Sequence, residues 1–237
     1  MTRIEPQSLT IDVDPARRVS ALLTAPENAR ACCVLAHGAG AGMAHPFMAR
    51  VADAFAANGI ATLRYQFPYM EQRSKRPDTP AIAHAAVRAA CVEAARRLPG
   101  LPLLAGGKSF GGRMTSQAQA IEPLLHVRGL VFLGFPLHPA GKPSDERAAH
   151  LFDVEVPMLF LSGTRDALAD LSLLEPLVAK LGAKATLETF PEADHSFHAP
   201  VKSGHTDAGN TTRIAELTRA WLQRNVLHEA QFPAGPG

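Results

Sequence analysis

The sequence has 237 residues, of which 46% are apolar and 19% are charged, and its formal net charge at pH 7 is +2. This balance is typical of a soluble globular protein, and the charge is too small to indicate nucleic acid or an anionic membrane as a partner. No apolar run approaches the roughly 18 residues of a membrane span, and the N-terminus lacks the features of a secretory signal. The cysteines number three and show no metal-ligand spacing, so we expect free, buried thiols in a cytoplasmic protein.

Strand-like apolar runs alternate with helical patterns along the chain. The expected strands are Ser8–Val13, Val19–Thr24, Ala31–Ala36, Ile60–Tyr65, Leu101–Ala105, Val127–Leu133, Pro157–Leu161 and Ala185–Thr189. The expected helices are Pro46–Asn58, Ala81–Leu98, a segment after the GGKSFGG stretch through about Ala120, Leu171–Leu181 and Asn210–Val226. This alternation predicts a three-layer α/β/α sandwich, in which helices cover both faces of a mostly parallel sheet.

The chain shows no linker or internal repeat, so we expect a single domain over residues 1–230 and a disordered tail over residues 231–237. The longest irregular stretch runs from Phe135 to Val156. It is too short for a folded cap domain, although it has room for one helix or a mobile flap.

The segment Gly107-Lys108-Ser109-Phe110-Gly111 fits the pattern G-x-S-x-G. In this pattern a sharp turn from strand to helix exposes a strained serine hydroxyl, and the glycines allow close backbone packing. Chance alone can produce such a match. The expected strand before it and helix after it are the context that favours a nucleophile, which would be Ser109.

A glycine-rich turn, His37-Gly38-Ala39-Gly40-Ala41-Gly42, follows the buried strand ACCVLA. Backbone N–H groups in such a turn can stabilise a developing oxyanion, and we predict the donors to be Ala39 and Phe110. Gly40 is the competitor for the first donor, and His37 is expected to have a structural role. A flexible turn or a phosphate-binding loop is the alternative, but the pattern matches neither a Rossmann fingerprint nor a P-loop.

An acid and a histidine follow the serine in the required chain order. Asp166 lies just past the strand PMLFL, where it could orient a histidine, while Asp170 reads better as the cap of the next helix. His195 lies in the loop before the last helix and would take the proton from Ser109 and return it to the leaving group. His198 and His205 are its rivals.

Active-site loops of such a sheet gather at the carboxyl ends of the strands, which brings further side chains near the serine. The candidate substrate contacts are Gly40, Tyr69, Lys108 and His138. The cationic members would suit an anionic group on the substrate, whereas the alternative for each is plain surface charge. No cluster suggests a metal site.

Together these motifs resemble the α/β-hydrolase superfamily. The segments HGAGAGM, HPFM, RYQFPYM, GGKSFGGRM, FPLHPAGKP and GTRD look like those of small, lidless, dienelactone-hydrolase-like proteins and of the testis-expressed α/β-hydrolase-like proteins of animals. The resemblance implies an eight-stranded, mostly parallel sheet without a cap domain, no cofactor, and a triad at Ser109, Asp166 and His195. Phe110 departs from the methionine that many relatives carry.

The function expected from these observations is hydrolysis of a small ester, thioester or lactone through an acyl-serine intermediate. The expected partner is a small-molecule substrate, with no nucleic acid, membrane or metal, and the oligomeric state stays open. The alternative is a binding or scaffold protein on a retained hydrolase fold, since some animal relatives are subunits of chromatin complexes.

Overall fold

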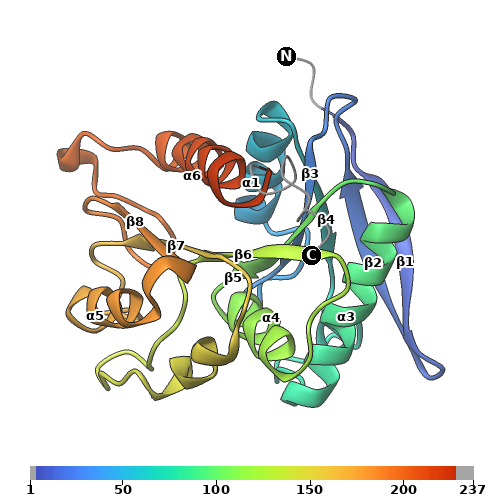
Figure 1. Cartoon of the computed structure of the whole chain (residues 1–237), viewed down its shortest axis with the longest axis horizontal. Coiled ribbons are helices and arrows are strands. Elements are labelled where there is room, and N and C mark those ends of the chain that lie inside the picture. The colour runs from blue at the N-terminus through green and yellow to red at the C-terminus, as the bar shows by residue number, and fades with distance from the viewer. Residues whose placement is uncertain (1–3, 228–237) are drawn as a thin grey trace, which may run out of the picture.

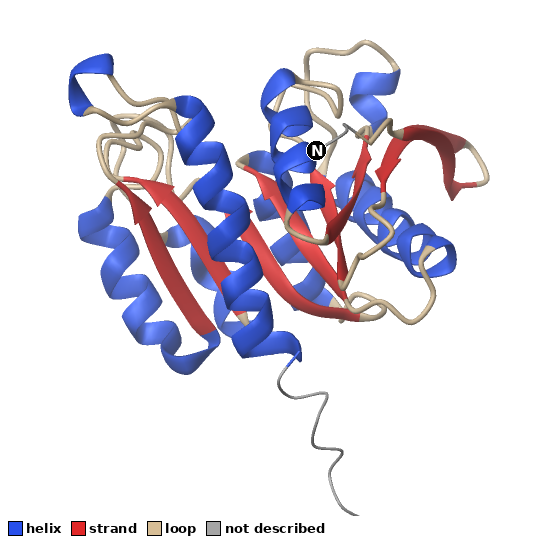
Figure 2. Cartoon of the chain, turned by 90° about the horizontal axis from the view of Figure 1, so that it is seen from above, coloured by secondary structure: helices blue, strands red, loops and turns tan. Residues whose placement is uncertain are grey.

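The computed structural model describes residues 4–227, and it contains an eight-stranded sheet in the order β1-β2-β4-β3-β5-β6-β7-β8. The strands are β1 (Gln7–Asp14), β2 (Arg17–Thr24), β3 (Ala31–Ala36), β4 (Ile60–Tyr65), β5 (Leu103–Lys108), β6 (Val127–Leu133), β7 (Met158–Gly163) and β8 (Ala185–Phe190). Strand β2 pairs antiparallel with both β1 and β4, and strands β3 to β8 are parallel. The predicted α/β sandwich is confirmed (Figures 1 and 2). The expected tail, 231–237, lies outside the described residues.

Helices cover both faces of the sheet (Figure 1). They are α1 (Pro46–Ala57), α2 (Pro68–Glu71), α3 (Pro80–Arg97), α4 (Phe110–Ile121), α5 (Leu171–Leu181) and α6 (Asp207–Leu222). Shorter segments are the 3-10 turns η1 (Glu146–Asp153), η2 (Gly182–Lys184) and η3 (Val201–Ser203) and the π-helical turn η4 (Gln223–Leu227). The stretch between β6 and β7 thus carries η1, and no cap domain interrupts residues 4–227.

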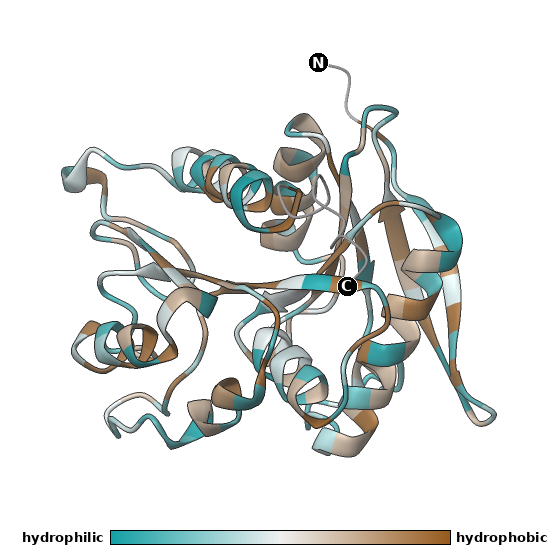
Figure 3. Cartoon of the chain, viewed as in Figure 1, coloured by the Kyte–Doolittle hydropathy of each residue, from teal (hydrophilic) through white to brown (hydrophobic). Residues whose placement is uncertain are grey.

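Two hydrophobic cores lie on opposite faces of the sheet. One contains residues of α3, α4 and α5, and the other contains residues of α1 and α6. Strand β3 serves both, because successive side chains of a strand point to opposite faces: Cys32 belongs to the first core and Cys33 to the second. Hydrophobic residues accordingly gather along the central strands, while the helices also carry hydrophilic ones (Figure 3).

Strand β5 runs three residues beyond its expected end at Ala105. Glycine is rare in strands, so the sequence suggested that pairing stops there. The structure instead pairs Gly106 with Val131 and Gly107 with Ala36. A Cβ on Gly106 would lie 1.9 Å from the Val131 carbonyl oxygen and one on Gly107 would lie 2.1 Å from the Ala36 carbonyl oxygen, so only glycine lets β5 approach its neighbouring strands this closely.

Two helical details also differ from expectation. Helix α2 lies in a segment for which neither a helix nor a strand was expected. Helix α6 starts at Asp207 rather than Asn210, because the Thr206 side chain caps it by accepting a hydrogen bond from the Gly209 N–H at 3.0 Å. These shifts leave the arrangement of the parallel strands unchanged, and their carboxyl ends meet at one edge of the sheet.

Candidate active site

Ser109 occupies a sharp turn between β5 and α4. Its backbone has φ 50° and ψ −114°, a strained conformation for a residue with a side chain. The flanking glycine Gly111 is required by space, since a Cβ there would lie 2.6 Å from the His37 carbonyl oxygen at the end of β3. The G-x-S-x-G pattern therefore has a steric basis here, and its geometry is that of a nucleophile elbow.

Asp166 and His195 are hydrogen-bonded to each other. His195 Nδ1 lies 2.8 Å from Asp166 Oδ2, and the other carboxylate oxygen accepts the Leu168 N–H at 2.8 Å. The Asp166 side chain is fully buried. Because the carboxylate can only accept, Nδ1 carries the proton and Nε2 keeps a lone pair. His195 Nε2 is buried and has no partner within residues 4–227, so it is the ring atom free to act as a base.

Ser109 and His195 approach each other across the end of β6. The Ser109 N–H donates to the Leu133 carbonyl at 3.2 Å, and a Cβ on the next residue, Gly134, would lie 3.2 Å from His195 Nδ1. No hydrogen bond joins Ser109 to His195 in the described structure. Such contacts are often long before substrate binds, so the geometry is compatible with a base beside the serine.

Gly134 is not among the residues that the sequence motifs singled out. Its φ of +68° and its close contact with the His195 ring would both strain a side chain at this position. The available signal was a glycine directly after the apolar strand Val127–Leu133, at the sheet edge that carries Ser109. A glycine at such a position indicates that another group approaches the backbone closely, but it does not identify His195 as that group.

The glycine-rich turn after β3 presents free backbone donors. The Gly40 N–H donates to the Tyr69 hydroxyl at 2.9 Å, so this competitor for the oxyanion is already engaged. Neither Ala39 nor Phe110 uses its N–H in a hydrogen bond within residues 4–227. Phe110 is the first residue of α4, where the helix dipole also favours a negative charge.

His37 connects this turn to the loop after β4. Its Nδ1 donates to the Gly38 carbonyl at 2.8 Å, and its Nε2 accepts the Phe67 N–H at 3.1 Å. Burial lowers the pKa of His37 to about 4, so the ring is neutral at pH 7. These contacts agree with the structural role expected for His37.

The expected substrate contacts are differently placed. The Tyr69 hydroxyl and the Gly40 N–H bind each other. His138 is buried, with Nδ1 on the Pro139 carbonyl at 3.0 Å and Nε2 accepting the Asp170 N–H at 3.3 Å. The Lys108 ammonium is buried. These residues are therefore paired with other groups or enclosed in the described structure, and their contact with a substrate stays a prediction.

The rival residues have other partners. Asp170 caps α5 by accepting the Ser172 N–H at 2.9 Å, as expected from the sequence. His198 is exposed and pairs with Asp207 at 3.0 Å. Asp194, next to His195, instead accepts the N–H groups of Ser196 and His198 and so shapes the loop.

Within residues 4–227 no group of three or more His, Cys, Asp or Glu side chains could hold a metal ion, and no helix is both long and apolar enough to cross a membrane.

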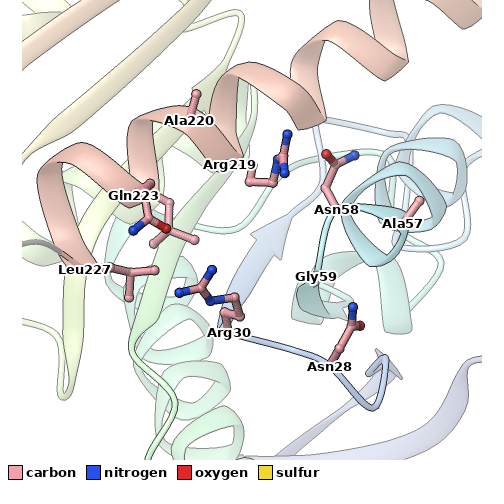
Figure 4. Close-up of a pocket in the computed structure, with 10 residues that line it drawn as sticks. Asn28, Arg30, Ala57, Asn58, Gly59, Arg219, Ala220, Gln223 and Leu227 are labelled. Carbon is pink, nitrogen blue, oxygen red and sulfur yellow. The ribbon is translucent and has the colours of Figure 1, made fainter.

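A separate cavity of about 370 Å³ is lined by Arg30, Gly59 and Arg219 among others (Figure 4). Arg30 and Gly59 precede β3 and β4, so this cavity lies at the amino ends of these strands, opposite the edge that carries Ser109.

A family model described as an alpha/beta hydrolase domain matches residues 29–223. The chain belongs to the α/β-hydrolase family. This membership supports a hydrolase function. Among similar solved structures, dienelactone hydrolase from Anabaena variabilis superimposes with a TM-score of 0.74 at 22% identity, covering 94% of this chain and 99% of that one.

Two further solved structures share the fold with this α/β-hydrolase. A lidless serine hydrolase from Xanthomonas campestris has a TM-score of 0.68 at 22% identity, with 100% of this chain and 99% of that chain covered. An esterase domain from a Rhodothermus marinus protein has a TM-score of 0.70 at 16% identity, with 93% and 99% covered. At these identities the likeness shows the fold alone.

Proposed function

We propose that this α/β-hydrolase is a serine hydrolase that cleaves a small ester, thioester or lactone through an acyl-serine intermediate. Ser109 is the nucleophile, His195 is the general base and then the general acid, and Asp166 orients His195. The observation that carries the proposal is the 2.8 Å hydrogen bond from His195 Nδ1 to Asp166, which leaves Nε2 as the basic atom.

The first half of the reaction follows from these positions. His195 Nε2 takes the hydroxyl proton as Ser109 Oγ attacks the carbonyl carbon, and the new imidazolium is stabilised by Asp166. The carbonyl oxygen becomes an oxyanion that accepts the N–H groups of Ala39 and Phe110. Collapse of this intermediate breaks the bond to the leaving group, which receives the proton from His195.

Water then repeats the sequence on the acyl-serine. His195 deprotonates the water, the second oxyanion uses the same two donors, and Ser109 leaves with the proton returned by His195. Two of the similar structures are a dienelactone hydrolase and an esterase domain, which supports a carboxylic ester or lactone as the substrate class.

We also propose that residues 1–230 form one hydrolase domain and that the protein works in the cytoplasm. Its three cysteines, Cys32, Cys33 and Cys91, are buried and free, which suits a reducing compartment. Burial raises the pKa of Cys32 and Cys91 to about 12, so these thiols are unreactive at neutral pH.

Labelling with a fluorophosphonate probe tests the nucleophile. The wild-type protein is expected to become labelled at Ser109 and to hydrolyse short p-nitrophenyl esters. Ser109→Ala should lose labelling, and His195→Ala should lower the esterase rate by at least about a thousandfold. A wild-type protein that neither labels nor hydrolyses any ester of the panel would favour the scaffold alternative.

Ser116→Ala is the matched control. Ser116 Oγ lies 2.8 Å from His150 Nε2, so this buried serine has a histidine partner but lies inside α4, away from the strained turn. Its replacement should leave labelling intact. Loss of labelling in Ser116→Ala, together with retention in Ser109→Ala, would show that Ser116 is the nucleophile and would contradict the proposal.

A further inference from the structure

Lys108 is the residue before the nucleophile, and its side chain extends beneath the candidate site. Its Cγ lies 3.5 Å from the position that a Cβ on Gly38 would take, and its Nζ lies 3.2 Å from the corresponding position on Gly134. The side chain starts at the end of β5, passes the turn after β3 and ends beside the residue that follows β6. This path ends at the catalytic edge of the sheet, below its surface.

The Lys108 ammonium and the His195 ring share the space that Gly134 leaves open. The same Cβ position on Gly134 is 3.2 Å from Lys108 Nζ, 3.2 Å from His195 Nδ1 and 3.3 Å from His195 Cε1. Lys108 Nζ is buried and has no hydrogen-bond partner within residues 4–227. A buried cation without a partner is costly, so this arrangement calls for an explanation beyond packing.

The charged and titratable groups around the ammonium come from two loops. Asp166, after β7, and Asp194, before His195, both favour the charged form of Lys108. Neither carboxylate forms an ion pair with it among the described residues. Gly38 and Gly134, which also lie beside the Lys108 side chain, do not titrate, and the His195 ring lies beside Gly134 as well. Burial is the larger effect and lowers the pKa of Lys108 to about 8, so the ammonium is mostly charged at pH 7.

We propose that Lys108 is a positioning residue whose buried positive charge opposes protonation of His195 and thereby keeps the general base neutral in mildly acidic solution. The inference rests on the proposed function, because it concerns the same histidine. It replaces the expected substrate contact of Lys108 with an action through His195. A cation on the same side of Gly134 as the ring raises the free energy of the imidazolium, while Asp166 lowers it, and the two charges together set the pH at which the base works.

The test is the pH dependence of kcat/KM for a p-nitrophenyl ester, or of the fluorophosphonate labelling rate, in Lys108→Met. Methionine keeps a long, flexible side chain and removes the charge. The acid limb of the profile is expected to move to higher pH by about one unit, with an unchanged or higher plateau. Lys108→Arg, which keeps the charge, should restore the wild-type limb.

A purely structural role would lower the plateau of Lys108→Met and leave the acid limb in place, and this result would overturn the inference. Lys180→Met is the control, since Lys180 is exposed in the last turn of α5, and it should leave the whole profile unchanged. If no protein labels at any pH, the proposed function fails. If the proteins label with coincident acid limbs, only the role of Lys108 fails.

A second measurement uses the wild-type protein and does not depend on whether Lys108→Met folds. As Lys108 loses its proton near pH 8, the opposing charge disappears and His195 becomes a stronger base. The wild-type labelling rate should therefore rise by a second step between about pH 7 and pH 9, and this step should be absent from Lys108→Arg, because arginine stays charged. A step of the same size in Lys108→Arg would contradict the inference, because arginine keeps its charge over this range.

Discussion

At the scale of single residues, the candidate site depends on positions where a side chain must be absent. Gly107 and Gly111 let the Ser109 turn approach β3, and Gly134 leaves room for the His195 ring. Gly163 has a similar role, since a Cβ there would lie 2.2 Å from the Ala193 carbonyl oxygen in the loop that carries His195. The side chains of the candidate site can lie close together because the backbone carries no side chain at these glycines.

Gly134→Ala tests this at one position. The new methyl group would face His195 Nδ1 and Lys108 Nζ at 3.2 Å and would displace the ring from its hydrogen bond with Asp166. The substitution also forces alanine into φ +68°. We expect kcat/KM to fall by about tenfold or more and the free energy of unfolding to fall by about 1–2 kcal/mol.

Gly141→Ala separates the two effects. Gly141 has nearly the same φ, +71°, but a Cβ there would meet nothing within 4 Å. It should lose a similar free energy of unfolding and keep its activity. Equal activities of the two variants, measured by steady-state kinetics beside urea unfolding, would show that the space at Gly134 is not needed by His195.

At the scale of elements, the sequence predicted what depends on local patterns. The buried strand Ala31–Ala36 was predicted with its observed bounds, because a run of six apolar residues is typical of a strand that is buried on both faces. The β5 end was wrong because Gly106 and Gly107 pair only when β3 and β6 are in place. The position of His138 was predicted from its loop alone, and the hydrogen bond that its ring accepts from the Asp170 N–H could not be predicted, because it joins segments distant in sequence.

Helix α6 docks on the sheet through Trp221, and this contact is testable. Trp221 is 1% exposed, and a Cβ on Gly129 of β6 would lie 2.7 Å from its ring, so the glycine makes a flat surface for the indole. Trp221→Ala should lower the free energy of unfolding by about 3–5 kcal/mol. Because this is the only tryptophan in the chain, unfolding has to be followed by circular dichroism.

Ile121→Ala is the companion variant for this measurement. Ile121 ends α4 and is 72% exposed, so its truncation should change the free energy of unfolding by less than about 0.5 kcal/mol. Similar losses in both variants would mean that α6 contributes little through its indole and that the two faces of the sheet are not packed as the structure describes.

At the scale of the whole molecule, the sequence predicted the layers and the order of the candidate catalytic groups, but not the distances between them. The order Ser109, Asp166, His195 is a property of the chain, and it survives in the structure as three neighbouring loops at one sheet edge. That Lys108 Nζ and the His195 ring both lie beside Gly134 depends on how several strands meet, and no local pattern contains it. Long-range contacts of this kind require the sheet order, which the alternation of elements leaves open.

The stability of the whole molecule should fall in acid because of His37. Its pKa is about 4 in the folded protein and near 6.5 in the unfolded chain, so between these values the unfolded chain binds the extra proton. Stability from this group is therefore present above pH 6.5 and is lost as the pH falls toward 4. Protonation would also set a ring N–H against the Phe67 N–H that Nε2 now accepts. The expected loss is about 3 kcal/mol between pH 7 and pH 4.

Urea unfolding at several pH values measures this loss. His37→Gln can still accept the Phe67 N–H but does not titrate, so its stability should depend less steeply on pH by about that amount. His150, whose pKa burial also lowers to about 4, leaves a residual slope of the same sign in both proteins. His205→Gln, at an exposed position, should keep the wild-type slope. If His37→Gln also keeps the wild-type slope, then the neutral His37 between the glycine-rich turn after β3 and the loop after β4 is not what limits stability in acid.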